Sequence, residues 1–309
     1  MERKSRIDAF GAVSLSGFAL LLAFNQVVIK VTNGGLQPVF FAGLRSAGAV
    51  LCILAWLKWR GIPLRFQAGT LLAGLITGAV FALEFLCLFV ALDLTTVGRT
   101  AVIFYSMPVW LALIAHVVLP DDRITPVKAA GLAAAVAGVA WAMLGRDPSG
   151  HGSVMGDLAA LGAAVGWAVT AMMAKASPLR RERPEIQLIW QVAVSAPILL
   201  IAAPFFGPLV RDLQWIHIAG LAFQIVVVVS AGFIFWLWLL SIYPASGVAS
   251  FSFLSPVLSV LLGWALLGEK VGPGIVGPLV LVAVGIVLIN RQVPQKVRST
   301  RSSSAGGRM

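Results

Sequence analysis

Long apolar stretches, separated by short polar or glycine-containing connections, occupy nearly the whole chain. A helix needs about 20 apolar residues to cross roughly 30 Å of hydrocarbon at about 1.5 Å per residue. The pattern predicts ten transmembrane helices, with expected ranges 9–30, 37–58, 67–92, 97–118, 126–144, 153–175, 186–206, 216–240, 245–267 and 273–290. We therefore expect an all-α integral membrane protein.

Composition agrees with this fold class. Hydrophobic residues make up 59% of the chain and charged residues only 11%, whereas soluble domains are about half apolar and a quarter charged. The two cysteines lie inside apolar stretches and the three histidines are scattered, so we expect neither a metal site nor a cofactor. A membrane-embedded enzyme would need a catalytic constellation inside the bundle, and the sequence offers none. We therefore do not expect an enzyme.

The basic residues predict how the chain lies in the membrane. The net charge is +11, and most of the 23 lysines and arginines fall in segments on one side of the ten spans. Cytoplasmic loops carry an excess of lysine and arginine. The pattern predicts a multi-pass protein of a bacterial-type inner membrane with both termini in the cytoplasm. The basic, serine-rich segment 293–309 is expected to be a disordered tail.

Two apolar stretches with a proline at matched positions indicate an internal repeat. TAVIFYSMPVWLAL at 100–113 resembles VASFSFLSPVLSVL at 248–261, with Pro108 and Pro256 in register. A proline frees a carbonyl group and kinks an apolar helix, which a membrane tolerates where protein or a watery cavity receives the freed group. We expect both prolines to act as hinges.

Each half of the chain carries five predicted spans. An odd number means that the second half enters the membrane from the opposite side, which makes the two halves inverted repeats. The expected units are 1–147 and 148–292. A binding cavity between two such repeats is the usual arrangement in an alternating-access transporter.

Two charged side chains lie deep within predicted spans. Glu84 and Arg45 are both about eight residues from the outer ends of their spans, or roughly 12 Å deep. A charged group at that depth is costly and normally has a partner or a function. Two interpretations remain open: an ion pair that locks two helices, or a role for Glu84 in contacting a substrate amine or carrying a proton.

Further polar and aromatic residues inside spans are candidates for a substrate site. Tyr105 and Trp167 are predicted to line a cavity, although Trp167 also suits plain core packing. Asn25 suits either an interhelical hydrogen bond or a solute contact. Ser252 suits a local backbone bond or a ligand, and Phe81 suits either an aromatic wall or simple packing.

The chain resembles the drug/metabolite transporter superfamily, in its EamA-type ten-helix branch. Pro38 to Arg45, PVFFAGLR, is similar to the second-helix motif of that family, and the segment 243–271 is similar to its ninth-helix signature. Within the superfamily, Glu84, Tyr105 and Trp167 carry a narrower similarity to YddG-like aromatic amino-acid exporters.

The resemblance implies an exporter of amino acids and related small metabolites that uses alternating access. A drug, a nucleotide sugar or a polyamine is the alternative substrate. The expected partners are the small-molecule substrate and the lipid bilayer, not nucleic acid. Proton antiport and flux driven by the solute gradient are both compatible with the sequence, which does not specify an oligomeric state.

Overall fold

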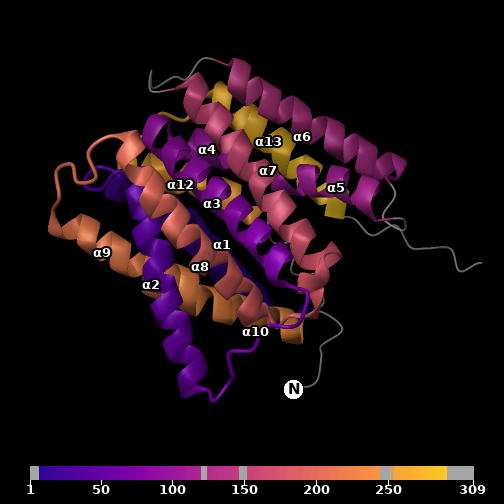
Figure 1. Ribbon diagram of the computed structural model, residues 1–309. Helices are drawn as coiled ribbons and strands as arrows, with labels where there is room; N and C mark the ends of the chain where they lie inside the picture. The colour runs from indigo at the N-terminus through magenta and orange to yellow at the C-terminus, as the bar shows by residue number, and fades with distance from the viewer. Residues whose placement is uncertain (1–6, 120–123, 146–151, 244–250, 252, 291–309) are drawn as a thin grey trace, which may run out of the picture.

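The computed structural model of the protein describes residues 7–119, 124–145, 152–243, 251 and 253–290, and most of these residues are helical (Figure 1). The α-helices are α1 (Ala9–Thr32), α2 (Pro38–Trp59), α3 (Leu71–Leu94), α4 (Val97–Phe104), α5 (Met107–Val118), α6 (Pro126–Leu144), α7 (Val154–Ala176), α8 (Pro184–Ala202), α9 (Trp215–Phe223), α10 (Phe233–Ile242), α12 (Leu254–Leu267) and α13 (Pro273–Asn290). Two 3₁₀ turns, η1 (Pro178–Arg181) and η2 (Ala203–Phe206), and one π-helix, η3 (Gln224–Gly232), complete the described elements.

The predicted fold class is confirmed. Nine helical segments among the described residues are long and apolar enough to cross a membrane, and α12 is a shorter apolar helix. Most segments begin and end within a few residues of the predicted spans. Of the predicted span 245–267, the described part is the residue 251 and the stretch from 253 onward, and the predicted tail 293–309 lies outside the described residues.

The predicted span 97–118 is two helices rather than one kinked helix. α4 ends at Phe104, and α5 begins at Met107 with Pro108 in its first turn. Because proline has no N–H group, it cannot continue the ladder of α4. The carbonyl of Ile103 instead accepts hydrogen bonds from both the N–H group and the hydroxyl of Ser106, at 3.2 and 2.6 Å, which closes a tight turn. The result is a break at Tyr105 and Ser106 in the middle of the span.

The predicted span 216–240 contains an element that its apolar pattern did not reveal. Nine residues from Gln224 to Gly232 form a π-helix between α9 and α10. Ser230 donates its hydroxyl to the carbonyl of Ile225, five residues earlier, at 2.8 Å. π-Helical segments are rare and often occur at functional sites.

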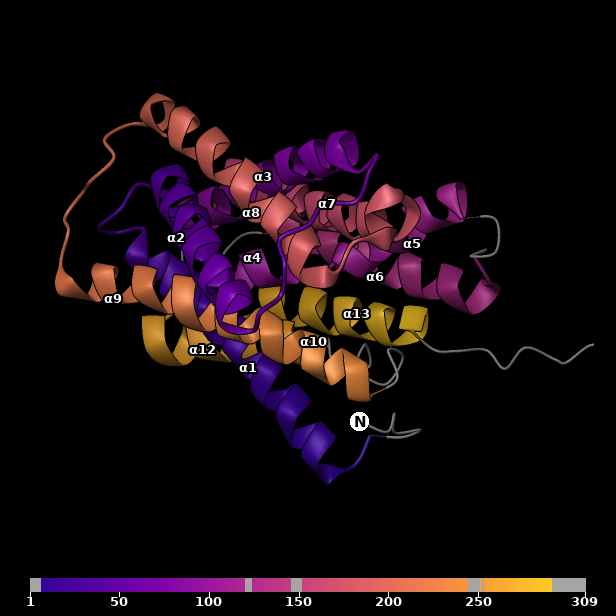
Figure 2. The ribbon, with the colours of Figure 1, turned by 60° about the horizontal axis from the view of Figure 1, so that its bottom comes forward.

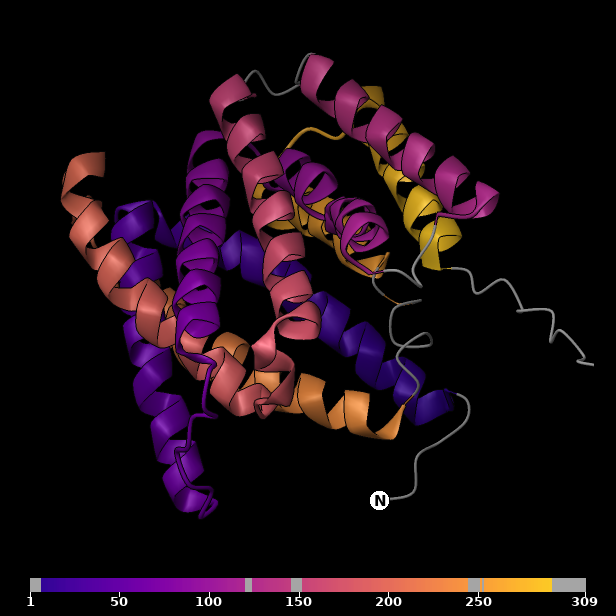
Figure 3. The same cartoon turned by 45° about the vertical axis from the view of Figure 1, so that its right-hand side comes forward.

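Equivalent helices of the two halves of the chain make equivalent contacts with the other half. α3 packs against α7 and α8, and the matching segment of the second half, which includes η3, packs against α1 and α2. α6 packs against α13, and the two lie side by side at one edge of the molecule (Figure 3). This reciprocity is the packing expected of two five-span repeats related by a pseudo-two-fold axis.

The bundle has two ends, and successive spans run between them in opposite directions. We call the end at which α1 begins the proximal end, and the end at which α1 finishes the distal end. Figure 2 shows the start of α1 and the end of α10 close together at the proximal end, where the Tyr243 hydroxyl donates to Asp8 at 2.7 Å. The end of α3 and the start of α4 lie at the distal end.

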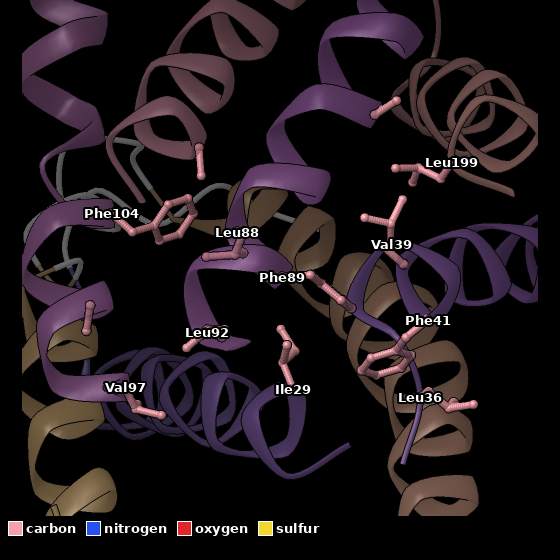
Figure 4. Packing of buried hydrophobic residues seen from close by; sticks show 14 of the residues in the cluster. Ile29, Leu36, Val39, Phe41, Leu88, Phe89, Leu92, Val97, Phe104 and Leu199 are labelled. Carbon is pink, nitrogen blue, oxygen red and sulfur yellow. The ribbon is translucent and has the colours of Figure 1, made fainter. Parts of the chain in front are cut away.

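The largest apolar core lies between α1, α2, α3, α4 and α8. Ile29, Val39, Phe89 and Leu199 are fully buried and point toward one another from four helices (Figure 4). Phe41 contacts Phe89 edge to face, with ring centroids 4.9 Å apart. This core fixes α2 against α3, the two helices that carry Arg45 and Glu84.

Candidate substrate cavity

A cavity of about 510 Å³ lies between helices of both halves of the chain. Its volume falls within the roughly 300–1,000 Å³ range of small-molecule sites. The residues that line it come from α1, α2, α3, the α4–α5 break, α7, α8, η3 and α10: Leu22, Asn25, Gln26, Arg45, Phe81, Glu84, Phe85, Leu88, Phe104, Tyr105, Met107, Trp167, Thr170, Ala171, Ala174, Lys175, Pro184, Gln187, Leu188, Gln191, Val228, Phe233 and Trp236.

The cavity opens at the proximal end. Its lining includes Lys175 and Pro184, which are exposed where α7 ends and α8 begins. Its lining also includes Arg45, Glu84 and Tyr105, which are only 5%, 2% and 4% exposed. A solute therefore reaches these buried groups from the proximal end.

Charged and backbone contacts close the distal end. Lys30 donates to the carbonyls of Asp93 and Thr95 at the end of α3, at 3.3 and 2.8 Å. Arg211 forms a two-pronged ion pair with Asp93 at 2.7 and 2.9 Å. These hydrogen bonds to Asp93 raise the pKa of Arg211 above its ordinary value.

A second set of distal contacts orients α4. The carboxylate of Glu269 accepts hydrogen bonds from the backbone N–H groups of Val97 and Gly98, at 2.6 and 2.9 Å. A carboxylate at a helix N-terminus satisfies free donors and complements the helix dipole. Arg99, on the same turn, pairs with Asp157 at the start of α7. The distal end is therefore fastened by α3, α4, α7, α12 and the α8–α9 connection.

Glu84 lies where α3 crosses α7 closely. The approach is possible because residue 166 is glycine: a Cβ atom there would lie 3.0 Å from the Cβ of Glu84. The hydroxyl of Thr170, one turn along α7, donates to Glu84 at 3.2 Å. No other described residue donates a hydrogen bond to this carboxylate.

Arg45 and Glu84 share the cavity without forming an ion pair with each other. The guanidinium of Arg45 instead lies over the ring of Phe85, 4.0 Å from its centroid. Its Nε atom is buried and has no hydrogen-bond partner among the described residues. Of the two interpretations of this charge pair, the locking ion pair is thus absent from this conformation.

The structure places most of the sequence-predicted site residues around one cavity. Five of the six line it: Asn25, Phe81, Glu84, Tyr105 and Trp167. The sixth, Ser252, lies outside the described residues. Whether these side chains bind a substrate stays a prediction.

The predicted hinges lie beside the cavity rather than on it. Pro108 directly follows Met107, which lines the cavity at the α4–α5 break. Pro256 is buried in the first turn of α12. The hinge role of the two prolines stays a prediction.

Two interhelical polar groups adjoin the cavity. Asn25 accepts a hydrogen bond from Gln224, the first residue of the π-helix, so its interhelical interpretation holds in this conformation. The hydroxyl of Tyr105 lies close to Gln26, Ser255 and Ser259, which joins the α4–α5 break to α1 and α12.

Sequence reasoning missed several polar lining residues. Thr170, Gln187 and Gln191 line the cavity, and Gln187 and Gln191 lie one turn apart on the same face of α8. Two glutamines four residues apart in an apolar helix would have been a usable signal. Thr170 had no such signal, because a threonine satisfies its hydroxyl within its own helix as readily as elsewhere.

The fold and the cavity define a polytopic membrane protein with a solute-sized chamber reachable from one end. The sequence profile of the EamA-like transporter family matches residues 9–144 and again residues 154–291. The chain belongs to this family of membrane transporters.

Relatives and a solved structure agree with this assignment. The uncharacterized transporters YvbV and YoaV of Bacillus subtilis are 29% and 26% identical over 88% and 87% of this chain, and over 91% and 92% of their own lengths. A probable amino-acid metabolite efflux pump of Salmonella typhimurium is 24% identical over 92% of this chain and 95% of its own length. One crystal structure covers 89% of this chain and 95% of its own, with a TM-score of 0.64 and 21% identity, which supports the fold.

Proposed function

We propose that this transporter exports amino acids, chiefly aromatic and other neutral ones, together with related small metabolites. The observation that carries the proposal is the cavity. It is closed at the distal end, reachable from the proximal end, and brings a carboxylate and an amide together with aromatic rings. An amino acid offers the matching chemistry, an ammonium group beside an apolar side chain.

In this proposal Glu84 and Asn25 contact the polar end of the solute. Trp167, Tyr105 and Phe81 contact its side chain, because aromatic rings give large, rigid contact area in such pockets. Ser252 adds a hydrogen bond from the ninth span. The similarity to YddG-like exporters supports this assignment of roles.

The distribution of charge predicts the orientation of the protein in the membrane. The excess of lysine and arginine predicts that the proximal end faces the cytoplasm of a bacterial-type plasma membrane. The described conformation then faces inward. The name of the relative in Salmonella typhimurium, a probable efflux pump, supports export. Export would follow when the units 1–147 and 148–292 rock about Pro108 and Pro256 and open the distal end.

Counterflow tests the proposal. Proteoliposomes that contain the pure protein and are loaded with unlabelled phenylalanine should accumulate labelled phenylalanine, whereas empty liposomes should not. Counterflow measured with a drug cation, a nucleotide sugar and a polyamine tests the alternative substrates. Counterflow with one of these solutes and none with any amino acid would contradict the proposal.

The same vesicles resolve the energy source. Export measured with and without an imposed proton gradient separates proton antiport from flux driven by the solute gradient. A carboxylate such as Glu84 inside the cavity is the group through which a proton would be coupled, so Glu84→Gln should abolish any dependence on the proton gradient.

A further inference from the structure

Arg45 is the buried cation of the cavity, and the sequence analysis assigned it no role beyond an ion pair. It lies on α2, 5% exposed, with its guanidinium over Phe85 and 5.7 Å from the centroid of Phe89. No side-chain hydrogen bond joins it to any described residue, and its Nε is buried without a partner. A buried arginine without an anion is costly, and such an unsatisfied group calls for an explanation.

The two aromatic contacts leave the donors of Arg45 free. Rings attract a guanidinium through its flat face, whereas the five N–H groups point outward from its edge. The face of Arg45 is therefore used by Phe85, while its edge is available to an acceptor. Arg45 and Phe85 both line the cavity, so a solute inside it can approach this side chain.

The shape of a guanidinium edge suits one class of ligand. Two parallel N–H groups match the two oxygens of a carboxylate, and such charge-assisted pairs are roughly twice as strong as neutral hydrogen bonds. Glu84, on the neighbouring helix α3, supplies the opposite charge to the same chamber and is held by Thr170. One cavity thus presents a buried anion and a buried cation that form no ion pair with each other.

We propose that Arg45 binds the α-carboxylate of the substrate, while Glu84 binds its ammonium group. This inference rests on the proposed function and narrows it: the transported solutes are zwitterions that carry both groups. Amines without a carboxylate and acids without an amine are poor substrates, because each leaves one buried charge of the cavity without a partner.

Binding of three phenylalanine-like compounds to the purified protein tests this pairing. Phenylalanine carries both charges, phenethylamine only the ammonium group, and 3-phenylpropionate only the carboxylate. Scintillation proximity with labelled phenylalanine gives the affinity of each compound by competition, and it does not require the protein to complete a transport cycle. We expect both analogues to compete at least about tenfold more weakly than phenylalanine.

The decisive variant is Arg45→Gln. Phenylalanine and 3-phenylpropionate should lose affinity by about tenfold or more, whereas phenethylamine should be unaffected, so that the preference for phenylalanine over phenethylamine collapses. Arg45→Lys keeps the positive charge but lacks the two parallel N–H donors of a guanidinium. It should restore part of the preference for phenylalanine over phenethylamine. Glu84→Gln should show the reverse pattern, with 3-phenylpropionate unaffected.

The control is Arg211→Gln, which removes the same charge at the distal surface, outside the cavity. It should leave the ratio of the three affinities unchanged. A purely structural role for Arg45 would lower all three affinities together, and an unchanged preference in Arg45→Gln would overturn the inference while the proposed function stands. If wild-type protein binds none of the three compounds and shows no amino-acid counterflow, the proposed function itself is overturned.

Discussion

Arg99 and Asp157 join α4 to α7 through a buried, two-pronged ion pair. The Nε–Oδ1 and Nη2–Oδ2 distances are both 2.7 Å, and the side chains are 6% and 1% exposed. The remaining donors of Arg99 reach the carbonyls of Gly145 and Met143, each at 3.1 Å, at the end of α6. One arginine therefore fastens three helices at the distal end, away from the cavity.

We expect Asp157→Asn to destabilise the protein strongly. The substitution leaves the Arg99 guanidinium buried without its anion, which typically costs about 3–5 kcal/mol. Thermal unfolding in detergent, followed by size-exclusion chromatography, should show a clear fall in Tm. Asp212→Asn, at an exposed position of the α8–α9 connection, should change Tm little. Equal Tm values for the two variants would contradict this role of the pair.

Trp167→Ala and Tyr105→Ala should each abolish most counterflow while the proteins still insert normally. Both side chains line the cavity, and truncating an aromatic residue that contacts the substrate typically costs more than about 1 kcal/mol of binding, or roughly fivefold or more in affinity. Trp215→Ala is the matched control, because Trp215 is 84% exposed and lies outside the cavity. Full activity in both cavity variants would show that Trp167 and Tyr105 do not contact the substrate.

Gly166→Ala should weaken substrate binding without a substitution in the cavity lining itself. Its new methyl group would meet the Cβ and Cα atoms of Glu84 at 3.0 and 3.2 Å, so α3 must move away from α7. Overpacking of this kind costs about 1–3 kcal/mol and shifts the carboxylate. Gly17→Ala is the control, since no atom lies within 4 Å of its new methyl group. Identical affinities in both variants would show that the close crossing does not position Glu84.

Arg211→Ala should loosen the distal closure locally. The segment before α2 and the α8–α9 connection are joined by two backbone hydrogen bonds. The N–H of Gln37 donates to the carbonyl of Leu209, and the N–H of Arg211 donates to the carbonyl of Gly35, both at 3.0 Å. The Arg211–Asp93 ion pair holds this connection against the end of α3. A partly exposed ion pair contributes at most about 1 kcal/mol, so we expect these amides to exchange up to about fivefold faster.

Hydrogen exchange measured by mass spectrometry checks this expectation, with α6 and α13 as internal references. Faster exchange confined to segments 33–37 and 207–214 supports a local latch. Uniformly faster exchange in every helix would instead indicate general destabilisation.

Much of the site could be predicted because membrane burial makes polar residues conspicuous. Glu84, Arg45, Asn25 and Tyr105 stand out in apolar stretches, and all four line one cavity. The α4–α5 break was only partly predictable. Pro108 marked its place, but the sequence did not reveal that the chain forms two separate helices joined by a turn in which Ser106 bonds to Ile103. The π-helix at 224–232 gave no signal in the apolar pattern, and its first residue, Gln224, bonds to Asn25 of α1, far away in the sequence.

The all-helical membrane class, the positions of the spans and the repeated proline-containing stretches all follow from the order of amino acids alone. Lipid imposes these features residue by residue, since each span must be apolar and satisfy its own backbone. Three features instead come from the packing of the helices. Arg45 and Glu84 line one cavity without forming an ion pair, this cavity opens at the proximal end, and polar contacts fasten the distal end. Those outcomes depend on which helices meet and how closely, and small residues such as Gly166 set that approach through contacts far apart in the chain.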